Sequence, residues 1–328
     1  MADATKKQRI FMTGASGYVG TSITEQAIAD GYEVYGLSRS ESNDEKLRKL
    51  GAVPVRGDLS SLDVLRREAA AADVVIHLVH DFNPRDMRDY KEVIKAQAAA
   101  TDAFADALQG TNKVLLTTGG ALMAKSDPNG GETDETAPTP DDEIIPRTLV
   151  EKHDLSVAPK GIRVASIRLA PFVYGRGGSG VRLFMQMGAR NGFVLTVNEG
   201  AATTTSVHVD DAARLYLLAA KHARAGEVYN ATAPGFVTHR EIVDAIAGLL
   251  DVPVKSLPLA VATEKMGAFL GRFLSADNKS SSAKARKEFG WEIKEGKAGI
   301  IEDIKNGSYV PVAQAIKSGA PDGKTWGS

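Results

Sequence analysis

Three glycines at three-residue spacing, Gly14, Gly17 and Gly20, could bind a phosphate group. They stand between a short apolar run, residues 10–12, and a segment with helical periodicity, residues 19–28. Gly14 permits a tight turn, Gly17 lets a phosphate approach the backbone, and Gly20 lets the helix pack closely on the strand. The start of such a helix attracts an anion through its N–H groups and its dipole. An ordinary strand–turn–helix connection is the alternative. The predicted contacts of a bound pyrophosphate are Gly14, Ser16, Gly17, Tyr18, Val19 and Gly20.

The residues that would select between the two dinucleotides directly follow the next predicted strand, which covers residues 32–37. They are Ser38, Arg39 and Ser40. An acidic side chain at this position would accept hydrogen bonds from a ribose 2′-hydroxyl and would repel a 2′-phosphate. No acid stands here, and a guanidinium suits a phosphate because it presents a planar fork of donors. The sequence therefore favours NADP(H) over NAD(H), with a solvated arginine at a strand end as the alternative.

Polar residues also follow two later strands, where carbonyl chemistry could take place. His80 and Asp81 follow the apolar run 74–79, and Thr118 ends the run 113–118. In open α/β sheets, ligands bind at the carboxyl ends of the strands. The Thr118 hydroxyl could hold a carbonyl oxygen. Asp81 could supply a proton if burial raised its pKa, or could act through water or His80. Alternatively, Asp81 caps a turn and His80 packs. Further predicted cofactor contacts are Leu78, Val79 and His80.

Strand-like and helix-like segments alternate between residues 9 and 169. This alternation predicts an α/β fold with a Rossmann-type doubly wound parallel sheet. The predicted dinucleotide-binding domain covers residues 1–170, with a return segment at about 205–232. Residues 171–204 and 233–328 are expected to form a smaller C-terminal α/β substrate lobe.

Two further stretches are expected to be irregular. Residues 124–142 are rich in Asp, Glu, Pro and Gly, and an irregular run of this length is usually a binding loop or a lid. Residues 172–180 have the composition of a loop.

The other predicted strands are residues 53–55 and 162–169. The predicted helices of the first domain after the glycine turn are residues 45–50, 62–71, 86–108 and 146–157.

The composition limits the classes of partner. The chain carries 40 basic and 41 acidic residues, so its net charge gives no general attraction to nucleic acid or to an anionic membrane. It has no cysteine, which excludes disulfides and thiolate metal sites and suits a reducing compartment. The histidines have no metal-like spacing, and no apolar run reaches the roughly 20 residues of a membrane helix. We expect a cytoplasmic protein that binds a small-molecule substrate without a metal.

Four motifs together resemble the extended and atypical short-chain dehydrogenase/reductases, a group that includes NAD-dependent epimerases and dehydratases. The motifs are Thr13–Gly20 for TGxxGxxG, Arg168–Gly175 for RxxxxVYG, Val207–Ala213 for VHVDDxA and Lys284–Trp291 for KARxxLGW. The resemblance implies a C-terminal lobe that covers the nicotinamide of the cofactor. It also implies cofactor contacts at Asp58, Leu59, Pro171 and Val173. Asp58 could at the same time cap the helix that follows it.

The Tyr-x-x-x-Lys pair of the resembled enzymes is missing. None of the eight tyrosines has a lysine four residues later. The lysine position falls near Arg147 and the tyrosine position near Glu143. The usual serine aligns with Thr118 and the usual asparagine with Gln97. An arginine can hold a ribose hydroxyl or a substrate anion, but its pKa is too high to transfer protons. Tyr174 is another candidate acid, with packing as its alternative role.

Three functions fit these observations. The first is an NADP(H)-dependent oxidoreductase that reduces a small carbonyl compound with a reassigned proton donor. The second is a redox-neutral epimerase, dehydratase or isomerase with bound NADP(H). The third is a non-catalytic NADP(H)-binding regulator, which the missing Tyr-x-x-x-Lys pair favours. The resemblance also implies a homodimer through the predicted helices 86–108 and 146–157, although packing within the chain would explain these helices equally well.

Overall fold

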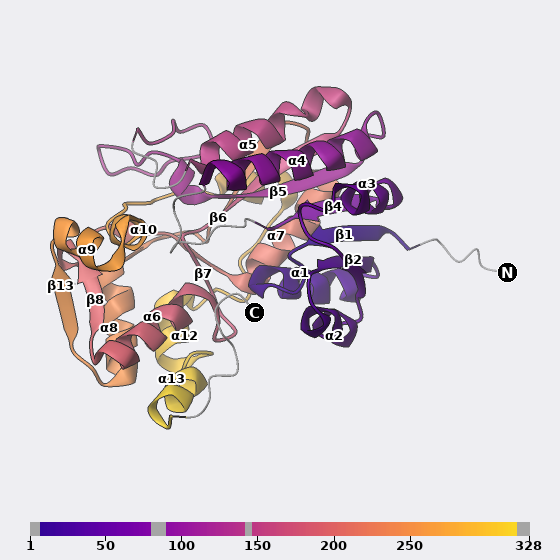
Figure 1. The fold of residues 1–328 in the computed structure, drawn as a ribbon. Helices are drawn as coiled ribbons and strands as arrows, with labels where there is room; N and C mark the ends of the chain where they lie inside the picture. Colours follow the sequence, from indigo (N-terminus) through magenta and orange to yellow (C-terminus); the bar gives the residue numbers. More distant parts are fainter. Residues whose placement is uncertain (1–6, 80–89, 142–145, 320–328) are drawn as a thin grey trace. The chain divides into compact units, whose positions relative to one another are not determined.

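The computed structural model describes residues 7–79, 90–141 and 146–319. Its central element is a seven-stranded sheet with the strand order β11-β6-β5-β4-β1-β2-β3, in which β1 to β5 run parallel (Figure 1). The predicted α/β doubly wound fold is thereby confirmed. The strands are β1 Arg9–Thr13, β2 Glu33–Ser38, β3 Val53–Arg56, β4 Val74–His77, β5 Val114–Gly120, β6 Arg163–Leu169 and β11 Glu227–Ala231.

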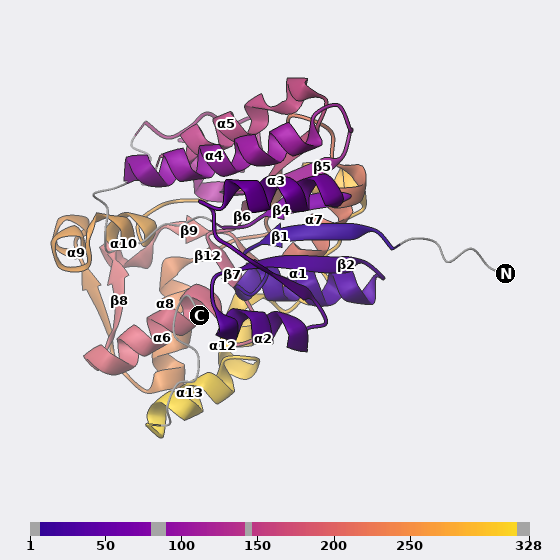
Figure 2. The same ribbon diagram turned by 45° about the vertical axis from the view of Figure 1, so that its right-hand side comes forward.

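Helices cover both faces of this sheet. Both ribbon views show α3, α4 and α5 on one face and α1 on the other (Figures 1 and 2). Phe11, Phe104 and Leu115 are fully buried between the sheet and the first group of helices, as the near-continuous apolar strands require. The helices are α1 Tyr18–Ala29, α2 Glu41–Lys49, α3 Leu62–Ala71, α4 Tyr90–Leu108, α5 Arg147–Ser156 and α7 Val209–His222.

The differences from the predicted bounds are most informative in three places. The helix predicted at residues 45–50 begins at Glu41, because the Ser40 hydroxyl accepts a hydrogen bond from the Asn43 N–H and caps α2. Strand β5 continues to Gly120 instead of ending at Thr118. Residues 172–180 are not all loop, because Phe172–Tyr174 form strand β7, which pairs in parallel with β10, Ser206–His208. A pairing between segments so far apart in the chain leaves no local signal in the sequence.

The described residues divide into two compact units. The first comprises residues 7–79, 90–119, 148–167 and 213–229, and the second comprises residues 120–141, 146–147, 168–212 and 230–319. The sequence assigned residues 120–147 to the first domain, whereas in the structure they group with the second unit. The remaining elements are α6 Ser179–Asn191, β8 Val194–Val197, β9 Thr203–Thr204, β12 Val237–Thr238, α8 His239–Leu250, β13 Val254–Leu257, α9 Leu259–Met266, α10 Ala268–Phe273, α11 Ala283–Phe289, α12 Gly299–Asn306 and α13 Val310–Lys317.

Hydrogen bonds tie residues 124–141 to the second unit. Thr133 forms an isolated parallel bridge with Ser280, and the Glu135 carboxylate accepts a bond of 2.8 Å from the Asn230 N–H. The segment is irregular, as predicted, but these bonds hold it in place, and they do not support its interpretation as a lid. Among the helices of the described ranges, none is both long enough and apolar enough to cross a membrane.

Candidate functional site

The glycine turn between β1 and α1 has three glycines with three different roles. Gly14 has φ +74°, a conformation that side chains rarely adopt, and a Cβ there would lie 3.2 Å from both Leu78 Cβ and Val79 Cγ2. A Cβ on Gly20 would lie 2.1 Å from the Gly14 carbonyl oxygen, so Gly20 is required for α1 to pack on the turn. A Cβ on Gly17 would meet, among the described atoms, the Gly14 oxygen at 3.1 Å and nothing else within 4 Å. The space beside Gly17 is therefore open to a ligand.

The start of α1 suits an anion. Gly17 is the N-cap and has no side chain to cap the helix, and the first turn contains no acidic residue. The Lys46 ammonium, from α2, donates a hydrogen bond of 2.5 Å to the Ser16 carbonyl oxygen and brings a positive charge to the turn. Helix N–H groups, dipole and ammonium all favour negative charge here. The residues of this turn therefore fit the pyrophosphate of a dinucleotide.

A buried hydrogen-bond chain fixes the strand ends beneath the turn. Gln97 Nε2 donates to the Val79 carbonyl oxygen at 2.8 Å, so Gln97 Oε1 faces His77 Nε2, also at 2.8 Å. His77 Nδ1 then accepts from the Thr13 hydroxyl at 2.7 Å. Burial lowers the pKa of His77 to about 4, so the ring stays neutral at physiological pH. Nothing in the sequence identifies the partners of His77, because Thr13 and Gln97 lie 64 and 20 residues away.

Thr118 points toward the body of the first unit. Its Oγ1 donates to the His77 carbonyl oxygen at 3.0 Å and lies 2.8 Å from the Tyr216 hydroxyl. Because the single Thr118 proton goes to the carbonyl, Tyr216 is the donor in the second bond. Tyr216 is fully buried on α7, 98 residues along the chain, and no pattern in the sequence indicates this contact. In this arrangement Thr118 connects β4, β5 and α7, and its hydroxyl proton is used within the protein.

Arg147 lies over the carboxyl end of β5. A Cβ on Gly120 would be 3.5 Å from Arg147 Nη1, an ordinary contact distance, so the guanidinium lies next to Gly120. The two residues at this strand end, Gly119 and Gly120, both lack a side chain. The geometry thus places a fixed positive charge beside the strand end at which an α/β sheet gathers its ligands.

Tyr174 is a packing residue in this structure. It is 1% exposed, its hydroxyl donates to the Gly296 carbonyl oxygen at 3.3 Å, and its ring lies edge-on to His208. Burial raises its pKa above the ordinary value, which makes it a poorer acid. Next to it, the Asp211 carboxylate of the VHVDDxA motif accepts hydrogen bonds from the backbone N–H groups of residues 294, 295 and 296. The motif therefore holds the second unit together.

The other predicted residues have separate places. The Ser38 hydroxyl donates to the Ser40 carbonyl oxygen at 3.1 Å, and Arg39 is exposed just beyond β2. Asp58 accepts hydrogen bonds from the Ser60 N–H and hydroxyl, and these bonds lower its pKa. Its carboxylate therefore closes a turn before α3, whose N-cap, Ser61, makes no side-chain capping bond.

The predicted contacts divide between the two units. A Cβ on Gly14 would lie 3.2 Å from both Leu78 and Val79, so the glycine turn and the residues after β4 lie together, and the cofactor contacts of Leu78 and Val79 stay predictions. Leu59 is half-buried in the first unit, whereas Pro171 and Val173 belong to the second unit. His80, Asp81 and Glu143 lie outside the described residues. Within the described ranges, no group of three histidine, aspartate or glutamate side chains could hold a metal ion.

The amino-acid sequence of this chain is similar to those of several known proteins. A family model described as the NAD dependent epimerase/dehydratase family matches residues 10–232. An uncharacterized protein of Schizosaccharomyces pombe is 36% identical over 304 residues, which cover 92% of this chain and 99% of the relative. A 4-hydroxy-2-methyl-3-oxo-4-farnesyl-3,4-dihydroquinoline-1-oxide ketoreductase of Stigmatella aurantiaca is 27% identical over 234 residues, 67% of each chain.

A solved structure supports the same fold. The UDP-glucose 4-epimerase of Thermus thermophilus, in a complex with NAD, aligns with a TM-score of 0.71 at 20% identity, over 92% of this chain and 98% of that one. At this identity the likeness concerns the fold alone. Together with the motifs and the geometry of the glycine turn, the family match over more than half of the sequence leads to one conclusion: the chain belongs to the NAD-dependent epimerase/dehydratase family.

Proposed function

We propose that this protein is an NADP(H)-dependent oxidoreductase that reduces a small carbonyl compound. The observation that carries the proposal is the glycine turn, where the space beside Gly17 is open and no side chain caps α1. Such a turn suits the pyrophosphate of a nicotinamide dinucleotide. The ketoreductase from Stigmatella aurantiaca supports the choice of a reductase over an epimerase.

The preference for NADP(H) is assigned to Arg39. Strand β2 ends without a carboxylate, and the two neighbouring serines are already hydrogen-bonded, Ser38 to the Ser40 carbonyl oxygen and Ser40 to the Asn43 N–H. The exposed guanidinium of Arg39 is then the group suited to a 2′-phosphate.

We expect NADPH to bind about tenfold more tightly than NADH, which corresponds to about 1.4 kcal/mol. Arg39→Ala should remove this preference by weakening NADPH alone, because the 2′-phosphate is what distinguishes the two cofactors. Fluorescence titration of both cofactors measures it. Lys49→Ala, an exposed lysine of α2, serves as the control for general charge. Equal affinity of the wild-type protein for both cofactors would show that Arg39 is only a solvated side chain.

The bound cofactor would supply the hydride for carbonyl reduction. The Arg147 guanidinium is assigned to hold the substrate oxygen, because it lies beside the end of β5 and can stabilise the negative charge that develops there. Its pKa is too high to donate a proton, so the proton comes from Asp81 or from water. Thr118 could bind the substrate oxygen directly only by giving up its bond to the His77 carbonyl oxygen.

Arg147→Gln is expected to lower kcat by roughly ten- to a thousandfold with little change in NADPH affinity. The rate of NADPH oxidation with a panel of aldehydes, ketones and enones measures kcat. Lys152→Gln, an exposed residue of the same helix, is the matched control and should leave kcat unchanged. An unaltered kcat in Arg147→Gln would remove Arg147 from the mechanism.

A non-catalytic NADP(H)-binding regulator is the second candidate. It is favoured by the missing Tyr-x-x-x-Lys pair and by the committed hydrogen bonds of Thr118. Tight NADPH binding without consumption of any compound in the panel would decide for this candidate or for redox-neutral chemistry.

A further inference from the structure

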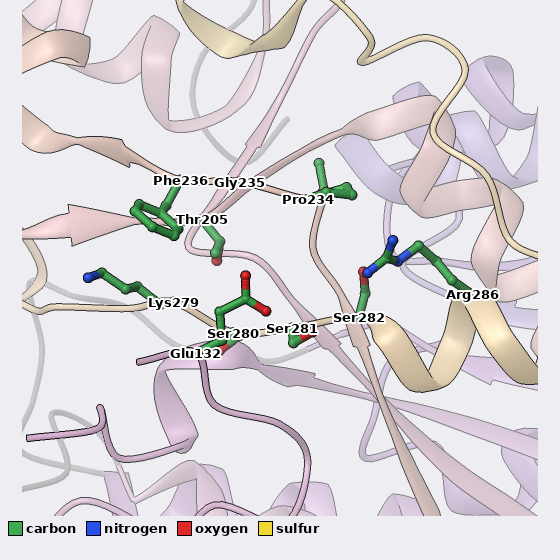
Figure 3. Close-up of a pocket in the computed structure, with 11 residues that line it drawn as sticks. Glu132, Thr205, Pro234, Gly235, Phe236, Lys279, Ser280, Ser281, Ser282 and Arg286 are labelled. Atoms are coloured by element: carbon green, nitrogen blue, oxygen red, sulfur yellow. The ribbon is translucent and has the colours of Figure 1, made fainter. Parts of the chain in front are cut away.

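A small polar cavity lies wholly within the second unit, and none of the residues assigned to the cofactor lines it. Its volume is about 30 Å³, and Figure 3 shows the side chains that line it. One ordered water needs about 10–15 Å³ on this measure. The cavity therefore has room for about two waters or for one polar group of a ligand, but not for a nucleotide.

Ser282 gives this cavity an unsatisfied donor. The residue is 2% exposed, it lines the cavity, and its Oγ has no hydrogen-bond partner among the described residues. It precedes α11 but its side chain does not cap that helix. The nearby bond to the Ala283 N–H, at 3.4 Å, is accepted by Ser281 Oγ instead. A buried hydroxyl without a partner is destabilising, so a polar group that bonds to it in the cavity would recover free energy.

Two cations border the same cavity. Arg286 lies one turn further along α11, is exposed, and forms no ion pair that the structure records within the described ranges. The Lys279 ammonium donates to the Gly130 carbonyl oxygen at 2.8 Å and lies 4.8 Å from the centre of the Phe236 ring. Figure 3 shows the Arg286 guanidinium and the Ser282 hydroxyl on one side of the cavity and Lys279 on the other.

The balance of charge at the cavity favours an anion. Glu132 is the acidic side chain among the described lining residues, and it stands against the two cations, which leaves one net positive charge. Phe236 also lines the cavity and is 48% exposed, so part of its apolar side chain is accessible to a ligand. A ligand with one anionic group and a small apolar body would match both features.

We propose that this cavity binds the oxyanion group, a carboxylate or a phosphate, of a small ligand. Arg286 and Ser282 donate hydrogen bonds to the oxyanion, Lys279 adds a second positive charge, and the exposed face of Phe236 contacts the apolar part of the ligand. The site is independent of the proposed reductase activity, because it shares no residue with the glycine turn or with Arg147.

The test is a titration of the full-length protein with sodium benzoate and with inorganic phosphate, against sodium chloride at equal ionic strength. Calorimetry and the shift of the thermal unfolding midpoint report binding. Wild-type protein should bind one of the two anions saturably at one site. Arg286→Gln should weaken that binding about tenfold, the loss expected for one charge-assisted contact. Lys287→Gln, on the same helix but not lining the cavity, is the control and should bind normally.

Two further variants separate the contributions of Phe236 and Ser282 to anion binding. Phe236→Ala should weaken benzoate and leave phosphate unchanged, which distinguishes an organic acid from a free phosphate. Ser282→Ala should weaken the bound anion without lowering the unfolding midpoint of the ligand-free protein, because it removes a hydroxyl that has no partner. The proposal is overturned if neither anion binds saturably or if Lys287→Gln weakens binding as much as Arg286→Gln. NADPH titration of the same samples keeps this outcome separate from any failure of the reductase proposal.

Discussion

Replacing Asp154 with Asn is expected to raise the free energy of unfolding at pH 8 by up to about 3 kcal/mol. Asp154 is 3% exposed on the inner face of α5, and its carboxylate accepts a hydrogen bond of 2.6 Å from the Thr101 hydroxyl. Burial is the main cause that raises its pKa from 3.8 to about 6, while Thr101 and Thr117 act in the opposite direction. The folded protein therefore favours the protonated carboxyl, and an asparagine imitates that form without the charge.

The direction of the pH dependence follows from this shift. A group whose pKa is higher in the folded state contributes stability that is fully present below its unfolded pKa, here near 3.8, and that is lost as the pH rises through about 6. The difference between Asp154→Asn and wild type should thus be largest at pH 8 and should shrink as the pH falls toward 4. Urea unfolding at pH 4, 6 and 8 measures it.

A nearby carboxylate provides the control. Asp102→Asn changes a half-exposed carboxylate on α4 that pairs with His153 at 3.1 Å, and such a pair contributes about 1 kcal/mol or less. Because this pair is charged only while His153 is protonated, the effect of Asp102→Asn should stay within about 1 kcal/mol between pH 4 and pH 8. If Asp154→Asn were destabilising by the same amount at every pH, the carboxylate would be a necessary hydrogen-bond acceptor and the argument from burial would fail.

Gly17→Val is expected to lower NADPH affinity by more than about a hundredfold while the protein stays folded. The added side chain would enter the open space beside Gly17, where the pyrophosphate should lie, and its Cβ would press on the Gly14 carbonyl oxygen at 3.1 Å. Relief of one such contact costs roughly 1–3 kcal/mol. Fluorescence titration gives the affinity, and thermal unfolding shows that the variant is folded.

Two other glycines make this test specific. Gly20→Val should mainly reduce stability, because its Cβ would lie 2.1 Å from the Gly14 oxygen and 2.8 Å from Ala15 Cα, so the turn itself must rearrange. Gly248→Val, an exposed position in α8 with nothing within 4 Å of its Cβ, should change neither property much. Near wild-type affinity in Gly17→Val would mean that no phosphate group binds at this turn.

The sequence predicts the local parts of this protein well. The glycine turn is encoded in eight consecutive residues, and the sheet in the alternation of apolar strands with helices. The partner of Thr118 could not be predicted, because Tyr216 is one of several tyrosines with no spacing relation to it. Ser40 shows a different limit, since a serine after a strand fits both a ligand contact and a helix cap, and the fold uses it as the cap.

Some site features depend on a residue type and a distant backbone position together. Arg147 is visible in the sequence as a substitution of the expected lysine, but its place over Gly120 depends on how α5 approaches β5. Tyr174 belongs to the RxxxxVYG motif, which the resemblance links to the cofactor. In the structure β7 pairs with β10, and the Tyr174 hydroxyl donates to the Gly296 carbonyl oxygen, which no pattern in the sequence indicates.

The carboxylate of Asp211 has a consequence for the order in which the protein can be made. Its acceptors are satisfied by N–H groups that lie 83 to 85 residues later, and the indole of Trp291 closes on its carbonyl. During synthesis at the ribosome, the second unit cannot settle until residue 296 has left the exit tunnel, although Asp211 emerged long before. Until then the Asp211 carboxylate stays hydrated and this part of the second unit stays unfolded, a state whose exposed apolar side chains favour aggregation.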